Sequence, residues 1–279
     1  MKGKKFLNKV QEKVCMVVRT SSGEAGVEEM TQRNVTHGFH LVEGKSHHSM
    51  EDYLFAEIIQ VDNNELGLYA IFDGHASSEV PNHLRSHLFD NILKEPDFWT
   101  ETENAIRRAY HVTDTKILEK SRDLGRGGST AVTAILINRE KLVVANVGDS
   151  RAVICRNGTA KQLSVDHEPS QERKDIEERG GFVLTLPGDV ARVDGQLAVA
   201  RAFGDKSLKE HLSSEPDVLT EMIDDETEFI LLASDGIWHI RSCRTKRRST
   251  VLRRSQIHKQ QQNVLLKRLY QGKAQTIYL

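Results

Sequence analysis

Short runs of apolar residues, separated by polar turns, fill most of the chain. The two cleanest runs, 68–72 and 229–233, have the length of a strand and contain no charged residue, so we predict that both are buried strands. Further runs of this kind predict strands at 37–42, 53–61, 131–137, 142–147 and 151–155.

Helical spacing occurs in two blocks between these strands. Apolar residues recur every fourth position from Val80 to Ile92. Ile106, Tyr110, Thr113 and Ile117 nearly repeat this spacing, so we predict two amphipathic helices that cover a sheet. A third, charged helix is expected at 170–179, ending at the glycine pair 180–181. Short strands joined by turns around helical blocks predict a layered α+β domain without βαβ repeats.

Two polar segments have no clear periodicity. Residues 1–35 are predicted to form a loosely held N-terminal lead-in. The glycine-rich residues 125–130 either cradle a phosphate or begin a hairpin; they lack the Gly-Lys-Ser/Thr ending of a P-loop, which favours the hairpin.

Composition is that of a soluble globular protein. Of the 279 residues, 38% are hydrophobic and 28% are charged, and no apolar run approaches the length of a membrane span. The basic N-terminal stretch lacks the apolar core of a secretion signal, and the three cysteines are widely spaced without a CxxC pair. These features predict an intracellular protein of the cytoplasm, the nucleus or both.

Charge is distributed unevenly along the chain. The net charge is −1, but residues 239–279 contain eleven Lys and Arg and no Asp or Glu. Residues 1–238 therefore carry 28 basic and 40 acidic groups, a net charge of −12. We expect a domain at 36–238 and a separate, disordered basic tail at 239–279.

Candidate chemistry lies at the ends of the two cleanest strands. Asp73, Gly74 and His75 follow the first strand, and Asp235 with a glycine follows the second. Carboxylates held at rigid strand ends, a glycine that lets a backbone carbonyl approach a cation, and an imidazole are what a metal site with acid–base chemistry needs. Asp-Gly is also a common turn signal, so a turn remains the alternative for Asp235; a turn does not need His75.

Other acids and histidines add weaker candidates. Glu51 and Asp52 are adjacent at the start of a strand, so only one of them can face the same site directly. Asp149 is a cap, a turn residue or a ligand. The four histidines at 37, 40, 47 and 48 could bind zinc, but without cysteines or a helical HxxxH pair we interpret them as surface residues.

Eight short motifs in order resemble the metal-dependent protein phosphatase 2C family, and the residues around Met50 are most similar to its plant members. They lie at Met50–Asp52, Phe72–His75, Gly128–Ala131, Val147–Arg151, Asp166–His167, Leu197–Asp205, Glu215–Pro216 and Ala233–Trp238.

The resemblance implies a β-sandwich of two antiparallel sheets flanked by α-helices, with a dinuclear Mn²⁺ or Mg²⁺ cleft at one end. It implies that Asp73 bridges two ions, that the Gly74 carbonyl binds one and Asp235 the other, and that Glu51 or Asp52 holds metal-bound water. His75 is then the acid that protonates the departing alkoxide, and Asp149 belongs to a third, weaker metal. Oxygen ligands suit these hard ions.

Two departures from the family pattern stand out. The phosphate-binding arginine of many members is replaced by His47, with Lys45 nearby, and neither side chain can form the bidentate fork of an arginine. The family's closing aspartate falls in the tail, which has no acid. Back-translation of the tail one base out of frame, beginning within Ser242, can give a family-like acidic sequence, so we expect a frameshift or splicing product; the alternative is a genuine basic tail that binds nucleic acid or anionic lipid.

The sequence thus predicts a metal-dependent serine/threonine phosphoprotein phosphatase that acts through a metal-activated water. We expect phosphorylated proteins as its substrates, no nucleic-acid partner, no membrane span and a monomer. The rival hypothesis is a catalytically weak or inactive truncated phosphatase that binds phosphoproteins without turnover.

Overall fold

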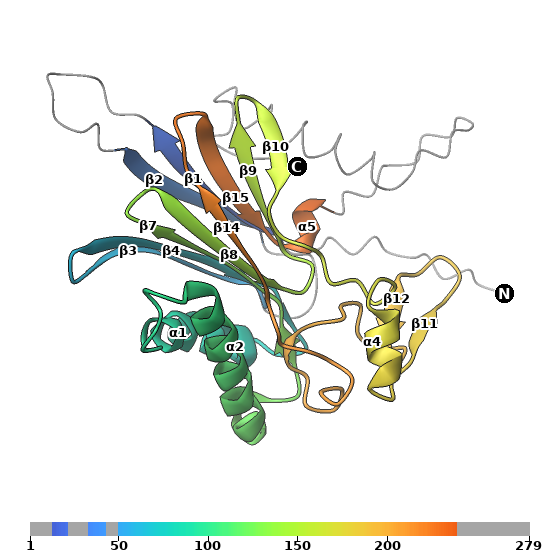
Figure 1. Ribbon diagram of the computed structural model, residues 1–279. Coiled ribbons are helices and arrows are strands. Elements are labelled where there is room, and N and C mark those ends of the chain that lie inside the picture. Colours follow the sequence, from blue (N-terminus) through green and yellow to red (C-terminus); the bar gives the residue numbers. More distant parts are fainter. Residues whose placement is uncertain (1–12, 22–32, 43–49, 239–279) are drawn as a thin grey trace, which may run out of the picture.

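A computed structural model describes residues 13–21, 33–42 and 50–238 (Figure 1). Two sheets lie face to face, and two long helices cover the outer face of one of them. The predicted α+β sandwich of antiparallel sheets with flanking helices is confirmed.

Each of the two large sheets has five strands, and all neighbouring strands run antiparallel. Sheet A is ordered β10-β9-β15-β1-β2 and comprises β10 (Thr159–Gln162), β9 (Arg151–Arg156), β15 (Thr227–Ala233), β1 (Lys13–Ser21) and β2 (Asn34–Val42). Sheet B is ordered β14-β8-β7-β4-β3 and comprises β14 (Asp217–Met222), β8 (Lys141–Val147), β7 (Ala131–Ile137), β4 (Asn64–Phe72) and β3 (Tyr53–Val61).

The N-terminal segment differs from its prediction. The expected lead-in at 1–35 is wrong for Lys13–Ser21, which forms β1 between β15 and β2 in sheet A. Val14, Met16 and Val18 alternate along this strand and are buried between the sheets. Cys15 is buried and Val17 partly buried on the other face, so Val14–Val18 is apolar throughout. This short run lies among charged and polar residues, and its partner, β15, lies some 200 residues away.

Smaller elements complete the fold. The helices are α1 (Glu79–Leu93), α2 (Thr102–Glu119), α3 (Ser121–Leu124), α4 (Arg173–Glu178) and α5 (Asp235–Trp238). A three-stranded sheet is ordered β13-β6-β5, with β13 (Phe203–Gly204), β6 (Gly128–Ser129) and β5 (Gly74–His75). A lobe built around α4, β11 (Val183–Thr185) and β12 (Ala191–Val193) projects from the sandwich (Figure 1). The helix expected at 170–179 is thus shorter than predicted, and the glycine-rich segment forms the middle strand β6.

Apolar residues are sorted by the faces of the strands. On β4, Tyr69 and Ile71 point between the sheets, whereas Ala70 and Phe72 pack against α1 and α2. Strand β4 is therefore buried on both faces, which explains the unbroken apolar run that identified it in the sequence. No helix in the described part of the chain is long and apolar enough to cross a bilayer.

The buried His83 on α1 predicts a pH-dependent stability. Burial and the nearby His87, Lys120 and Lys116 lower the pKa of His83 to about 4. The unfolded chain takes up a proton near pH 6.5 and the folded chain does not, so stability is present above pH 6.5 and is lost as pH falls toward 4. We expect His83→Phe to remove this loss and raise the unfolding free energy at pH 5 by about 1–2 kcal/mol more than at pH 7.5.

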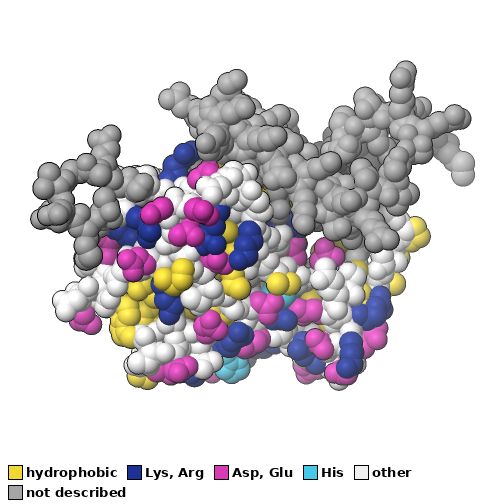
Figure 2. Space-filling model, turned by 45° about the horizontal axis from the view of Figure 1, so that its top comes forward, with side chains coloured by type: hydrophobic (Ala, Val, Ile, Leu, Met, Phe, Trp, Pro, Cys, Tyr) yellow, Lys and Arg dark blue, Asp and Glu magenta, His cyan; other side chains and the backbone are white. Residues whose placement is uncertain are grey.

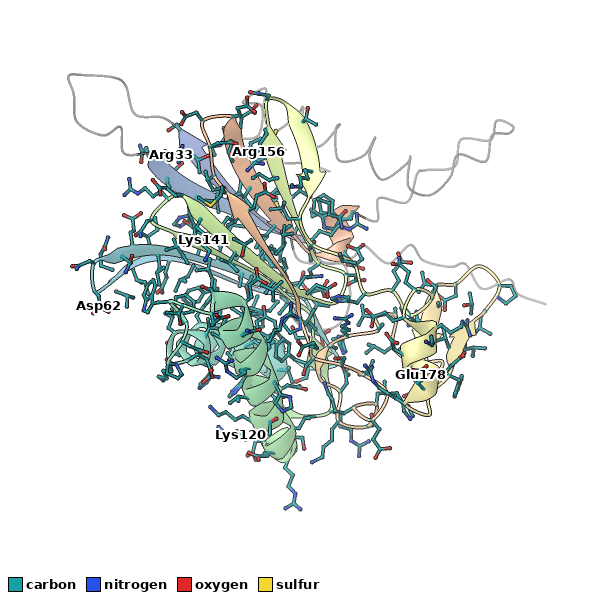
Figure 3. All side chains as sticks on the ribbon, viewed as in Figure 1. Arg33, Asp62, Lys120, Lys141, Arg156 and Glu178 are labelled. Atoms are coloured by element: carbon teal, nitrogen blue, oxygen red, sulfur yellow. The ribbon has the colours of Figure 1, made fainter. Side chains whose placement is uncertain are left out.

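Urea unfolding at the two pH values measures this difference. The matched control is His111→Phe, because His111 is exposed on α2. Lys120, one of the charges that lower the pKa of His83, lies at the end of α2 (Figure 3). An equal change at both pH values in the His83 variant would contradict the assignment.

Candidate active site

The strand register brings Asp52 and Asp73 together. In the β3–β4 pair Tyr53 lies opposite Phe72, so the next residues outward, Asp52 and Asp73, leave the two strands side by side. The Asp52 carboxylate is close enough to raise the pKa of Asp73. Of the adjacent acids Glu51 and Asp52, it is therefore Asp52 whose side chain meets Asp73, and it is buried.

Asp149 and Asp235 reach the same end of the sandwich from sheet A. Arg151 at the start of β9 lies opposite Ala233 at the end of β15. Asp149 lies two residues before Arg151, and Asp235 lies two residues after Ala233. Both acids contribute charge at Asp73, whose pKa they raise.

Gly74 lets these segments approach closely. A Cβ atom at this position would lie 2.5 Å from the Glu51 carbonyl oxygen and 2.6 Å from Cγ of Pro81. Only glycine fits without a shift of the backbone. The glycine therefore holds the segment carrying Glu51 and Asp52 against the segment carrying Asp73.

The segment after β6 fixes the backbone of Asp73. The Thr130 backbone N–H donates to the Asp73 carbonyl oxygen at 2.9 Å, and the Thr130 hydroxyl lies 2.9 Å from that of Ser150. Ser150 follows Asp149 directly. One threonine thus links the turns that carry two of the four acids.

The Asp149 turn is held from the other side by His167. The Gly148 backbone N–H donates to Nδ1 of His167 at 3.0 Å, so the ring proton is on Nε2, which lies 3.1 Å from Asp217. Gly148 has φ +102°, and a Cβ there would meet the Thr130 side chain at 2.5 Å. This turn is therefore packed as closely as the one at Gly74.

Asp235 opens the short helix α5. The Ser234 side chain accepts from the Val14 backbone N–H at 3.1 Å, which ties the strand end to β1. Trp238 closes the turn by donating to the Ala233 carbonyl oxygen at 3.0 Å, and the Arg151 guanidinium lies over its ring at 5.5 Å. Asp235 therefore begins a helical turn, not the hairpin that its Asp-Gly sequence left open.

Electrostatics set Asp73 and Asp149 apart from ordinary surface carboxylates. Burial, and then the three neighbouring carboxylates, raise the pKa of Asp73 well above its usual value. Burial, followed by the charges of Asp235 and Asp166, raises the pKa of Asp149 to about 8. Such repulsion is costly unless a cation neutralises it.

The donor set fits hard divalent cations. The four carboxylates and the backbone near Gly74 offer oxygen alone, which Mg²⁺ and Mn²⁺ prefer. Among residues 13–21, 33–42 and 50–238, no three acidic, His or Cys side chains form a ready-made metal cage. An ion here would accordingly keep several water ligands, as Mg²⁺ commonly does.

His75 lies beside this cluster on β5, paired with Gly128 of β6. Its Nε2 lies 2.7 Å from Oδ2 of Asp205. In the sequence Asp205 stands out only as the last residue of the motif Leu197–Asp205, and the 130 residues between it and His75 hide the contact. A signal for it was present in the acid that follows the strand-end glycine Gly204.

The remaining candidates are placed as follows. Lys45 and His47 lie outside the described residues, as does His48. His37 and His40 lie on β2; His37 is exposed and its ring packs edge-on against Tyr69 at 5.6 Å.

Comparison with known proteins gives the family. The family described as Protein phosphatase 2C matches residues 39–266. Probable protein phosphatase 2C 39 of Arabidopsis thaliana is 64% identical over 87% of this chain and 86% of its own length. Probable protein phosphatase 2C 62 of Oryza sativa subsp. japonica is 61% identical over 87% of the chain and 85% of its own length.

Solved structures share the fold. A sex-determining protein of C. elegans superposes with a TM-score of 0.63 at 26% identity, over 80% of this chain and 52% of that one. A phosphatase of Toxoplasma gondii superposes with a TM-score of 0.58 at 24% identity, over 81% of this chain and 79% of its own, which shows the fold alone. From the family match and its plant relatives it follows that this chain belongs to the protein phosphatase 2C family of metal-dependent protein serine/threonine phosphatases.

Proposed function

We propose that this chain hydrolyses phosphoserine and phosphothreonine esters with two Mn²⁺ or Mg²⁺ ions, which would acidify the attacking water and neutralise phosphate charge. The convergence of Asp52, Asp73, Asp149 and Asp235 at one end of the sandwich carries this proposal. Four neighbouring carboxylates with no cation partner would oppose folding, so the cluster makes physical sense as a cation site.

In this proposal the carboxylates of Asp73 and Asp235 hold the ions, with the carbonyl of Gly74. Asp52 meets Asp73 through its side chain and is the better candidate of the adjacent acids for orienting bound water. Asp149 supplies charge for a further, weaker cation.

His75 is proposed to donate the proton that the departing alkoxide needs. It is the one titratable side chain on β5, and its ring is partly exposed next to the acids. Its side-chain exposure of 28% leaves room for a substrate oxygen to approach. Lys45 and His47 are the candidates for contacts with the phosphate.

Proteins, rather than one fixed small molecule, are the proposed substrates. On the face in Figure 2, acidic and basic side chains of the described residues are interspersed, with no large area of one sign. A surface of this kind suits recognition through many weak contacts with a folded partner or an extended segment.

A phosphate-release assay tests the proposal. With a phosphothreonine peptide we expect turnover in Mn²⁺ or Mg²⁺, none after chelation, and recovery when the ion is returned. One observation favours the rival hypothesis, a phosphoprotein-binding module without turnover. Residues 239–279 contain no Asp or Glu, so they supply no further side-chain carboxylate to the site. Metal-independent binding of the peptide with no turnover would support the module and overturn the enzyme.

A further inference from the structure

Asp205 is a buried acid that the proposed chemistry leaves without a role. It is 6% exposed, and its Oδ2 atom lies 2.7 Å from Nε2 of His75. The two residues come from opposite strands of the small sheet: His75 ends β5, and Asp205 directly follows β13. Strand β6 lies between them and pairs with both.

The backbone around Asp205 aims its carboxylate at His75. The Asp205 N–H donates to the Gly127 carbonyl oxygen at 3.0 Å, and the residue has φ +49°, a conformation that non-glycine residues seldom adopt. A Cβ atom at Gly128 would lie 2.0 Å from Oδ2 of Asp205. The carboxylate therefore occupies the space that a side chain at Gly128 would fill. Gly128 is the residue of β6 that pairs with His75, so this space lies next to His75.

A second acid holds the same loop without touching His75. Asp114 on α2 accepts from the Gly204 N–H at 2.8 Å and pairs with Lys209 at 2.9 Å. The loop is thus anchored independently of the contact with His75. Because Asp114 already anchors the loop, we attribute the positive φ at Asp205 to the orientation of its carboxylate toward His75.

We propose that Asp205 is a positioning residue that accepts the Nε2 proton of His75 and leaves Nδ1 to serve the leaving oxygen. Among the described residues, Nδ1 of His75 has no hydrogen-bond partner. An ionised carboxylate can only accept, so the contact fixes which nitrogen carries the retained proton. The inference rests on the proposed function of His75.

The proton transfer then has a defined course. Water supplies the oxygen that becomes bonded to phosphorus, one of its protons stays on the phosphate product and the other passes to solvent. The bond between phosphorus and the serine or threonine oxygen breaks. The leaving oxygen keeps the electron pair of that bond and takes the proton from Nδ1. His75 ends neutral, with its remaining proton on Nε2 and directed at Asp205.

Asp205→Asn tests this role with two substrates. Asparagine tolerates a positive φ, but its amide can donate as well as accept, so the ring is no longer held in one tautomer. A phosphothreonine peptide has an alkoxide leaving group that needs a proton, whereas p-nitrophenyl phosphate releases a stable phenolate. We expect kcat to fall about 10- to 100-fold on the peptide and by less than about threefold on p-nitrophenyl phosphate.

Three controls separate positioning from loop stability. His75→Gln should show the same split between substrates, and adding Asp205→Asn to it should cost nothing further, because Asp205 acts through His75. Asp114→Asn, the matched change in the same loop, should affect both substrates equally. An equal loss on both substrates in Asp205→Asn, or a full further loss in the double variant, would overturn the proposal.

A spectroscopic readout is independent of turnover. The ¹⁵N spectrum of His75 should show a protonated Nε2 in the unaltered chain and a change in that signal in Asp205→Asn at the same pH. Unchanged imidazole signals would overturn this inference alone. Failure of the unaltered chain to hydrolyse either substrate would instead overturn the proposed function, and with it the catalytic meaning of the pair.

Discussion

Asp73→Asn is expected to reduce phosphate release from a phosphothreonine peptide by about a thousandfold or more. Asp73 lies at the centre of the four carboxylates, and its amide counterpart would lose the charge that holds a cation. Loss of several kcal/mol of metal-based stabilisation of the transition state corresponds to a factor of this size. Initial rates at saturating Mn²⁺ measure it.

The same substitution should stabilise the metal-free protein. It removes one charge from a group of neighbouring carboxylates that repel one another, so the melting temperature without metal should rise, while the increase on adding Mn²⁺ should shrink. Asp62→Asn is the matched control, because Asp62 lies in the turn between β3 and β4, at the opposite end of these strands from the acids (Figure 3). A metal-free protein that melts at a lower temperature, or retained activity, would contradict the account.

Gly74→Ala should disable the site by a steric route that leaves every acid in place. Its methyl group would meet the Glu51 carbonyl oxygen at 2.5 Å, and backbone cannot yield as a flexible side chain can. Overpacking of this kind costs about 1–3 kcal/mol. We expect that loss in urea unfolding, together with a fall in activity of about 100-fold, because a small displacement of catalytic groups has effects of this size.

Gly38→Ala provides the control for Gly74→Ala. Gly38 lies on β2, and a Cβ atom there would meet nothing within 4 Å. The control should retain activity and stability. If Gly74→Ala behaved like Gly38→Ala, the close approach of the Glu51 segment would not matter for the site.

The central strands and helices were predictable from local pattern. The β3 and β7 strands begin and end at the predicted residues, and α1 and α2 follow from their four-residue apolar spacing. Strand β4 is buried on both faces, so its run of apolar residues is unbroken. In each case the signal lies within about twenty consecutive residues.

Features that depend on distant pairing were not predictable in this way. The place of β1 in sheet A depends on its pairing with β15, which the sequence near residue 13 does not reveal. The choice between Glu51 and Asp52 follows from the β3–β4 register, not from composition. The contact between His75 and Asp205 requires the three-stranded order β13-β6-β5. The sequence motifs identified the residues of the site. Which of these residues lie next to one another became clear only from the pairing of the strands.

The central claim is that Asp73 and Asp235, delivered by separate strand ends, bind the same divalent cations. Anomalous diffraction from crystals grown with Mn²⁺ tests it most directly. The account predicts a strong manganese peak within coordination distance of Asp73 and beside Asp235. A peak elsewhere, or no peak at saturating Mn²⁺, would contradict it.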